Sequence, residues 1–183
     1  MKKAFFLDRD GVLNVEVDYL GNPDEMELLP GVPEALEMLH RAGFLAVVIS
    51  NQGGIAKGLF TEKDTGAVHA RMQNCLLRHS PLATLDAFFY CIHHPAVTGE
   101  CQCRKPKPFM FEKAAADFDI DLSGSFMIGD RMSDLFAGRN AGCKESCLVL
   151  TGYGEKDREK AAAENFQVAA DLFEAVQKLL KIR

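Results

Sequence analysis

AFFLDRDG, residues 4–11, is the stretch that decides the fold of this chain. Four apolar residues form a short run, which ends abruptly in two aspartates and a glycine. Similar strand-like runs recur along the chain, and segments with helical spacing separate them. The runs are residues 4–7, 45–49, 88–91, 126–128 and 147–150. Because parallel strands must be joined by crossover connections, this alternation predicts an α/β fold with a doubly wound, Rossmann-like, mostly parallel sheet.

Four of the intervening segments carry helix signals. Residues 33–42 repeat apolar residues at i and i+3, and Gly43 suits the position just past a helix. A second helix is predicted to begin at Thr61, which opens a sequence resembling a capping box. The polar stretch 155–164 is interpreted as a solvated surface helix. The last helix is expected to bury one side, made of Val168, Leu172, Val176 and Leu179.

Length and composition limit the classes of protein to consider. The chain has 183 residues, of which 48% are hydrophobic, so residues 1–183 are expected to form a single domain. Its 21 Lys and Arg against 26 Asp and Glu give no electrostatic footprint for binding nucleic acid. The apolar run near the start is too short for a signal peptide or a membrane span, so we expect a cytoplasmic protein with no membrane partner.

Polar clusters follow the predicted strands, at residues 8–11, 50–53, 101–106 and 129–134. In a doubly wound sheet the carboxyl ends of neighbouring strands meet at one crevice, so these clusters are expected to converge. The crevice would hold three or four carboxylates, a hydroxyl and a lysine. So many carboxylates repel one another unless a divalent cation lies among them, and oxygen ligands of this kind suit Mg²⁺.

The clusters resemble the four motifs of the haloacid dehalogenase (HAD) superfamily of phosphatases, in order and over about the whole chain. The matching segments are Asp8-x-Asp10-Gly-Val-Leu-Asn, Ser50-Asn51, Lys105 and Gly129-Asp130-x3-Asp134. Each has a plain structural interpretation, as a strand end, a helix cap or a solvated lysine, but four matches in sequence favour the functional one. The resemblance implies a HAD-like fold and a magnesium-dependent phosphomonoesterase.

The resemblance also implies a role for each residue. Asp8 is expected to attack phosphorus and form an aspartyl phosphate, while Asp10 donates a proton to the leaving oxygen and later accepts one from water. Ser50 and Lys105 would stabilise the phosphoryl group. The expected magnesium ligands are the Asp8 carboxylate, the backbone carbonyl of Asp10, and Asp130. Asp134 is expected to orient its neighbours.

A second metal is predicted in the loop of residues 91–108. Cys91-x-His93-x7-Cys101-x-Cys103 offers four soft or borderline ligands, the set that encloses a structural, tetrahedral Zn²⁺. The alternative is a loop of reduced thiols, and His94 competes with His93 as a ligand, with only the resemblance favouring His93. Zinc would fix the loop that carries Arg104 and Lys105.

Zinc loops of this kind occur in two HAD groups, the D-glycero-D-manno-heptose 1,7-bisphosphate 7-phosphatases and the histidinol-phosphate phosphatases. Residues 51–62, the start of the zinc loop and Thr151-Gly152 resemble the heptose enzymes more closely. Gly53, where serine is expected, departs from that pattern, and the short zinc loop is nearer to the histidinol group. Histidinol phosphate therefore stays an alternative substrate. A catalytically inactive phosphosugar-binding domain is the alternative of another class.

Residues 15–30 and 95–106 are too short for a separate cap domain, so the site is expected to be open, with selectivity coming from loops. Arg104 would bind the second phosphate of a bisphosphate, or else form an ion pair with Asp134 or another acid. We expect a monomer that acts on a small phosphorylated sugar, as in lipopolysaccharide biosynthesis. The predicted substrate-binding residues are Glu16, Val17, Asp18, Tyr19, Asn51, Gln52, Gly53, Arg104 and Arg131.

Overall fold

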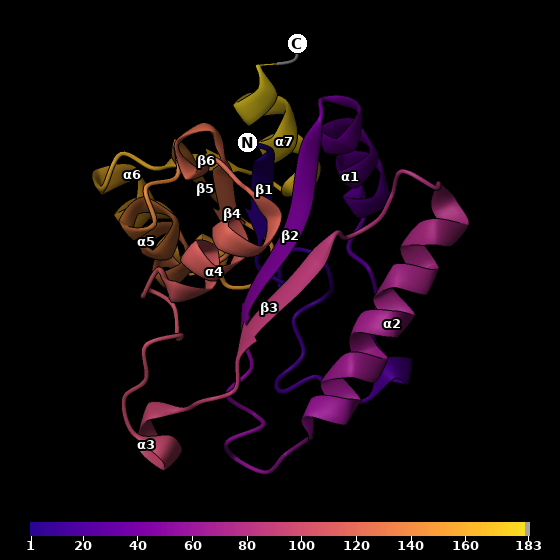
Figure 1. Ribbon diagram of the computed structural model, residues 1–183, viewed down its shortest axis with the longest axis vertical. Helices are drawn as coiled ribbons and strands as arrows, with labels where there is room; N and C mark the ends of the chain where they lie inside the picture. Colours follow the sequence, from indigo (N-terminus) through magenta and orange to yellow (C-terminus); the bar gives the residue numbers. More distant parts are fainter. Residues whose placement is uncertain (182–183) are drawn as a thin grey trace.

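The computed structural model describes residues 1–181 and is built on a six-stranded sheet (Figure 1). The strands are β1 (Lys3–Leu7), β2 (Phe44–Asn51), β3 (Ala87–Cys91), β4 (Phe126–Gly129), β5 (Glu145–Val149) and β6 (Gln167–Ala169). Their order is β3-β2-β1-β4-β5-β6, and every neighbouring pair is parallel. This confirms the doubly wound architecture, with the strand order reversing at β1.

Helices cover both faces of the sheet. They are α1 (Val32–Arg41), α2 (Glu62–His79), α3 (Pro95–Thr98), α4 (Phe109–Phe118), α5 (Met132–Asn140), α6 (Gly154–Ala163) and α7 (Leu172–Leu180), with short 3-10 turns η1 (Pro23–Glu25) and η2 (Leu122–Gly124). One apolar cluster joins α1, α2 and α7 to one face of the sheet, and two further clusters join α4, α5 and α6 to the other (Figure 1).

Strand β1 shows how the sequence builds both layers. Successive side chains of a strand point to opposite faces. Phe5 and Leu7 accordingly pack with α1, α2 and α7, whereas Ala4 and Phe6 pack with α4 and α5. All four are fully buried, as expected for an apolar run in the centre of a parallel sheet.

Most predicted helix boundaries are confirmed. Gly43 follows α1 in the left-handed region, with φ of 82°. Thr61 caps α2 through a capping box with Asp64. Val168 is wrongly placed by the sequence analysis, because it lies in β6 and not on the last helix. That helix begins only after Asp171, whose side chain accepts a hydrogen bond from the backbone N–H of Glu174 at 2.9 Å.

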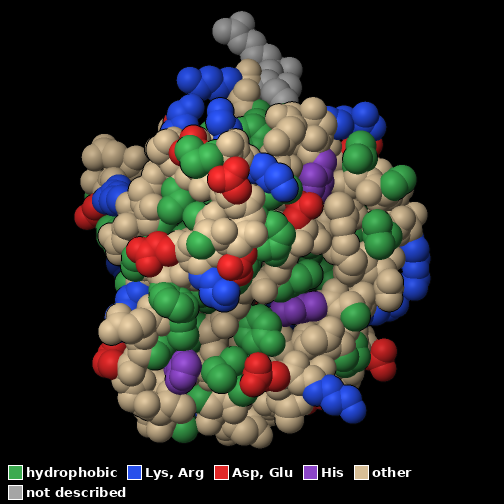
Figure 2. All heavy atoms as spheres, viewed as in Figure 1, with side chains coloured by type: hydrophobic (Ala, Val, Ile, Leu, Met, Phe, Trp, Pro, Cys, Tyr) green, Lys and Arg blue, Asp and Glu red, His purple; other side chains and the backbone are tan. Residues whose placement is uncertain are grey.

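The two possible cap segments stay small. Between residues 15 and 30 the structure contains one 3-10 turn, and between residues 95 and 106 it contains the four-residue helix α3. Lys and Arg side chains alternate with Asp and Glu over the face drawn in Figure 2, without a stripe of one sign. Within residues 1–181, we find no helix that combines the length and apolar character needed to span a bilayer.

Candidate active site

The polar clusters at the carboxyl ends of the strands line one cavity of about 450 Å³. Asp8 follows β1, and Ser50 lies at the end of β2. Asp130 follows β4 and lies fully buried beneath the cavity. Since β1 is flanked by β2 and β4, the cavity opens where the strand order reverses. Every residue predicted to be catalytic or substrate-binding lines it.

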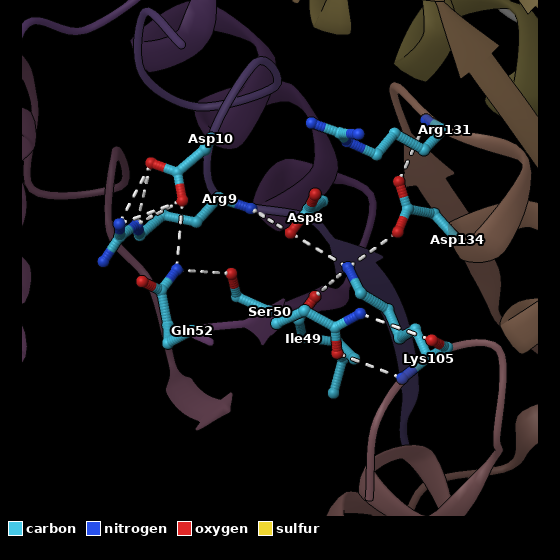
Figure 3. Close-up of polar contacts among 10 residues, drawn as sticks. Asp8, Arg9, Asp10, Ile49, Ser50, Gln52, Lys105, Arg131 and Asp134 are labelled. Atoms are coloured by element: carbon cyan, nitrogen blue, oxygen red, sulfur yellow. Dashed lines mark hydrogen bonds and ion pairs between the residues drawn. The ribbon is translucent and has the colours of Figure 1, made fainter. Parts of the chain in front are cut away.

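Lys105 is the central cation of this cavity (Figure 3). Its Nζ lies 2.9 Å from Asp8 Oδ1 and 2.8 Å from Asp134 Oδ1, and it also donates to the Ile49 carbonyl at 2.7 Å. Burial alone would lower the pKa of Lys105, but the charges of Asp134 and Asp8 reverse this and raise it. Lys105 therefore stays a buried cation, held where a phosphoryl group would meet Asp8.

The two oxygens of Asp8 have different surroundings. Oδ1 accepts a hydrogen bond from the backbone N–H of Arg9 at 2.8 Å and pairs with Lys105. Figure 3 shows no hydrogen bond or ion pair from the second oxygen, Oδ2, to the other residues drawn. Burial raises the pKa of Asp8 to about 6, against the opposing charge of Lys105. A cation beside Asp8 would favour the ionised form that attack requires.

Asp130 lies against two glycines that leave room for it. A Cβ on Gly11 would lie 2.4 Å from Asp130 Oδ2, and one on Gly152 would lie 2.2 Å away; both glycines also have positive φ, 79° and 58°. Oδ2 accepts a hydrogen bond from the backbone N–H of Tyr153 at 2.8 Å. Within residues 1–181, Oδ1 is buried without a hydrogen-bond partner. Such an orphaned oxygen is suited to a metal ligand.

The carboxylate cluster fits a divalent cation. Ligand atoms of Asp8, Asp130 and Asp134 lie within 4.8 Å of one another. Burial, then the charges of Asp8 and Asp134, raise the pKa of Asp130 to about 8, which a bound cation would reverse. Asp134 already pairs with Lys105 and accepts the backbone N–H of Arg131 at 3.0 Å. Asp134 is thus already paired, whereas Asp130 Oδ1 has no partner within residues 1–181.

Asp10 points away from Lys105 (Figure 3). Its carboxylate pairs with the Arg9 guanidinium at 2.9 Å and accepts hydrogen bonds from Asn14 Nδ2 and Gln52 Nε2, each at 3.0 Å. Gln52 also donates to Ser50 Oγ at 2.8 Å. Three donor side chains therefore hold the Asp10 carboxylate in one orientation beside the cavity. The sequence analysis assigned no role to Arg9 or Asn14, although both lie inside the quoted motif.

The cysteine cluster is compact enough to hold a zinc ion, with some spacings shorter than those of a loaded site. Tetrahedral zinc with sulfur and nitrogen ligands places ligand atoms about 3.5–3.8 Å apart. Sγ of Cys101 lies 3.7 Å from Sγ of both Cys91 and Cys103, while Cys91 and Cys103 are 3.0 Å apart. His93 Nδ1 lies 3.3 Å from Cys103 Sγ, whereas His94 Nδ1 accepts a hydrogen bond from the backbone of Ala96. The geometry therefore favours His93 as the fourth ligand.

The cysteine cluster is connected directly to the cavity. Arg104 Nη1 donates to the His93 carbonyl at 3.1 Å. The expected alternative, an ion pair of Arg104 with Asp134, is wrong, because Lys105 occupies Asp134. Asn51 accepts the backbone N–H of Lys105 at 3.0 Å and donates to its carbonyl at 3.3 Å. Both polar ends of the Asn51 amide are thus used to hold Lys105.

The loop of residues 15–20 forms another wall of the cavity. Burial, then the charge of Asp10, raise the pKa of Glu16 to about 7, with Arg131 opposing the shift. Tyr19 adopts a positive φ of 62°, and its hydroxyl accepts a hydrogen bond from Lys57. The guanidinium of Arg131 lies 3.8 Å from the centre of the Tyr153 ring. Neither Lys57, which lies in the motif of residues 51–62, nor Tyr153 has a role predicted from the sequence.

Comparisons with known proteins agree with this geometry. The HAD-hydrolase-like family model matches residues 102–175. The D-glycero-beta-D-manno-heptose-1,7-bisphosphate 7-phosphatase of Haemophilus ducreyi is 42% identical over 155 residues, 82% of this chain and 85% of that protein. Its Escherichia coli K12 counterpart is 38% identical over 184 residues, 97% and 95% of the two chains. The structure of the D,D-heptose 1,7-bisphosphate phosphatase from B. bronchiseptica, complexed with magnesium and phosphate, superposes with a TM-score of 0.88 at 37% identity, covering 99% of each chain.

Proposed function

Because the chain belongs to the family of HAD-like phosphatases that includes these heptose bisphosphate 7-phosphatases, we propose that it removes the 7-phosphate of D-glycero-D-manno-heptose 1,7-bisphosphate. It is a phosphoric monoester hydrolase. The observation that carries the proposal is the placement of Lys105 between Asp8 and Asp134 in a cavity of about 450 Å³. This volume lies within the range of small-molecule sites.

The first step is attack by Asp8 on the substrate. Its Oδ2 approaches phosphorus, and Lys105 offsets the charge of the phosphoryl oxygens, to one of which Ser50 donates a hydrogen bond. The bond between phosphorus and the sugar oxygen breaks as the bond to Asp8 forms. Asp10 supplies the proton that the sugar oxygen takes up. The product of this step is an aspartyl phosphate on Asp8.

The second step returns the enzyme to its starting state. A water molecule attacks phosphorus and gives a proton to Asp10, and the bond between phosphorus and Asp8 breaks to release inorganic phosphate. The hydrogen bonds from Asn14 and Gln52, with the ion pair to Arg9, hold the Asp10 carboxylate ready to accept that proton. One residue can therefore act as acid and then as base.

Two groups of side chains are suited to binding metal ions. Mg²⁺ would be held by Asp8, Asp130 and the backbone carbonyl of Asp10, and when bound it neutralises charge on the reacting phosphoryl group. The orphaned Oδ1 of Asp130 supports this assignment. Zn²⁺ would be enclosed by Cys91, His93, Cys101 and Cys103 as a structural ion, since four protein ligands leave no position open for water.

Arg104 is proposed to bind the second phosphate of the bisphosphate. It lines the cavity, and one of its five donors is used by the His93 carbonyl. The remaining donors suit a dianion. Arg104→Ala should therefore raise KM for the bisphosphate more than KM for a sugar monophosphate. Equal losses on both substrates would remove the assignment.

We also propose that the enzyme acts as a monomer in the cytoplasm, on a sugar phosphate and not on nucleic acid, with a product suited to lipopolysaccharide biosynthesis. None of the six cysteines forms a disulfide in the described residues, as is usual in a reducing compartment. The mixed charges visible in Figure 2 offer no continuous surface for a polyanion. Size-exclusion chromatography with light scattering tests the oligomeric state.

The decisive assay measures phosphate release with Mg²⁺ from three substrates: the heptose bisphosphate in both anomeric forms, histidinol phosphate and a 3'-phosphorylated oligonucleotide. The bisphosphate should be hydrolysed with the highest kcat/KM. Asp8→Asn should abolish release, whereas Asp24→Asn, which changes an exposed aspartate outside the cavity, should leave it unchanged. Faster turnover of histidinol phosphate would overturn the substrate, and full activity of Asp8→Asn would overturn the mechanism.

A further inference from the structure

Tyr153 touches three parts of the site that are distant in sequence. Its backbone N–H donates to Asp130 Oδ2 at 2.8 Å, and its hydroxyl donates to Asp18 Oδ1 at 3.3 Å. Its ring lies 3.8 Å from the guanidinium carbon of Arg131, within the range of a cation–π contact. Tyr153 therefore contacts Asp130, Asp18 in the loop of residues 15–20, and Arg131 in the wall of the cavity.

A second hollow explains why the ring is needed. It measures about 910 Å³ and is lined by Met132, Phe136, Tyr153 and Lys156 among others. Arg131 lines both this hollow and the cavity that contains Asp8. Arg131 therefore borders open space on two sides. Of these two spaces, Tyr153 lines only the second, where its ring lies against Arg131.

The charges around Tyr153 favour the same arrangement. The Tyr153 hydroxyl donates its hydrogen bond to the carboxylate of Asp18, in the loop of residues 15–20. The guanidinium of Arg131 carries a positive charge, which the face of the Tyr153 ring attracts. Arg131 and Asp18 thus both contact the side chain of Tyr153.

We propose that Tyr153 is a positioning residue, which holds Arg131 and the loop of residues 15–20 in the arrangement that binds the sugar phosphate. This inference rests on the proposed function. Tyr153 acts through substrate affinity and not through the chemical step, because its side chain does not line the cavity around Asp8. Its backbone N–H bond to Asp130 survives any side-chain replacement other than proline.

The test compares Tyr153→Leu, which removes the ring, with Tyr153→Phe, which removes only the hydroxyl. Loss of a cation–π contact corresponds to about a three- to tenfold change in binding. Tyr153→Leu should therefore raise KM for the heptose bisphosphate about three- to tenfold while kcat changes less than about twofold. Tyr153→Phe should retain most of the affinity. Lys156→Ala removes another cation 4.9 Å from the same ring and should leave KM unchanged.

Two further measurements separate positioning from a general structural effect. In an Arg131→Gln background, Tyr153→Leu should add little to the rise in KM, because the two residues act together. With para-nitrophenyl phosphate, which has neither sugar hydroxyls nor a second phosphate, Tyr153→Leu should leave KM unchanged. If Tyr153→Leu fails to fold, as judged by circular dichroism, Tyr153→Met provides the same removal of the ring.

The outcomes are distinguishable from those of the proposed function. If the wild-type protein hydrolyses no heptose bisphosphate, the proposed function fails. If the wild-type protein does hydrolyse heptose bisphosphate, but Tyr153→Leu keeps the wild-type KM, the role of Tyr153 is overturned. Independent, multiplicative effects of Arg131→Gln and Tyr153→Leu would also overturn it, since Tyr153 would then act elsewhere.

Discussion

Replacing Lys105 with methionine should destabilise the fold and nearly abolish activity. The side chain of Lys105 is 1% exposed and pairs with Asp8 and Asp134, whose side chains are 12% and 1% exposed. Methionine fills a similar volume but leaves two buried carboxylates without their cation. Removing one partner of a buried ion pair costs about 3–5 kcal/mol of the free energy of unfolding. Loss of the cation from the reacting phosphoryl group should lower kcat about 10²–10³-fold.

The loss of stability in Lys105→Met should depend on pH. Burial has already raised the pKa of Asp8 from 3.8 to about 6 against the charge of Lys105, so removal of that charge raises it further. When a carboxyl group has a higher pKa in the folded state than in the unfolded state, the protein loses stability as pH rises from the unfolded-state pKa through the folded-state pKa. The difference in free energy of unfolding between the variant and the wild type should therefore be large at about pH 8 and smaller at about pH 5.5.

Urea unfolding without added Mg²⁺ measures this loss, with Lys113→Met as the matched control. Lys113 forms an exposed pair with Asp117, so its replacement should cost only about 0.3–0.5 kcal/mol. Asp134→Asn in the Lys105→Met background should recover part of the stability, because one unpaired carboxylate is removed. A loss of stability in Lys105→Met no larger than that in Lys113→Met, or a loss that is larger at the lower pH, would contradict the role of Lys105 in neutralising Asp8 and Asp134.

Three further predictions concern the zinc loop and the helices. Cys101→Ser should lower the zinc content per chain, measured by elemental analysis, and should reduce kcat; full zinc occupancy would argue against the ligand assignment. Thr61→Ala removes the hydroxyl that caps α2 and should cost about 1 kcal/mol in urea unfolding, whereas an unchanged midpoint would show that the cap contributes nothing. The hydrogen bond to Asp86 raises the pKa of His40, so the stability it contributes is present at low pH and lost as pH rises through that pKa. His40→Gln should therefore cost more stability at about pH 6 than at about pH 9, by about 0.5–1 kcal/mol, and an equal cost at both would contradict the pairing.

The sequence was sufficient to predict the sheet and the convergence of its strand ends, because both follow from periodicity and from the rules of parallel connections. Reliance on periodicity also explains why Val168, which lies in β6, was predicted to belong to the last helix. Three residues next to a helix with apolar spacing continue its pattern, and only the pairing of Val168 with Leu148 identifies a strand. Asp171, the N-cap of α7, separates β6 from that helix, but a single capping residue is a weak signal beside the apolar spacing.

The partners of individual site residues were less predictable. Arg9 is fully buried, although arginine is usually exposed, because it turns toward Asp10. Nothing in the order of residues shows that Asn51 holds the backbone of Lys105, 54 positions away, or that Tyr153 lies against Arg131. Such contacts depend on side-chain orientation across separate loops, which spacing along the chain does not encode.

Reductive trapping during turnover tests the nucleophile most directly. Borohydride added while the enzyme hydrolyses heptose bisphosphate reduces an acyl phosphate to an alcohol, so peptide mass spectrometry should find homoserine in place of aspartate at position 8. The conversion should require both substrate and Mg²⁺. Reduction at another carboxylate, or an unmodified Asp8 in an enzyme that is turning over, would contradict the mechanism.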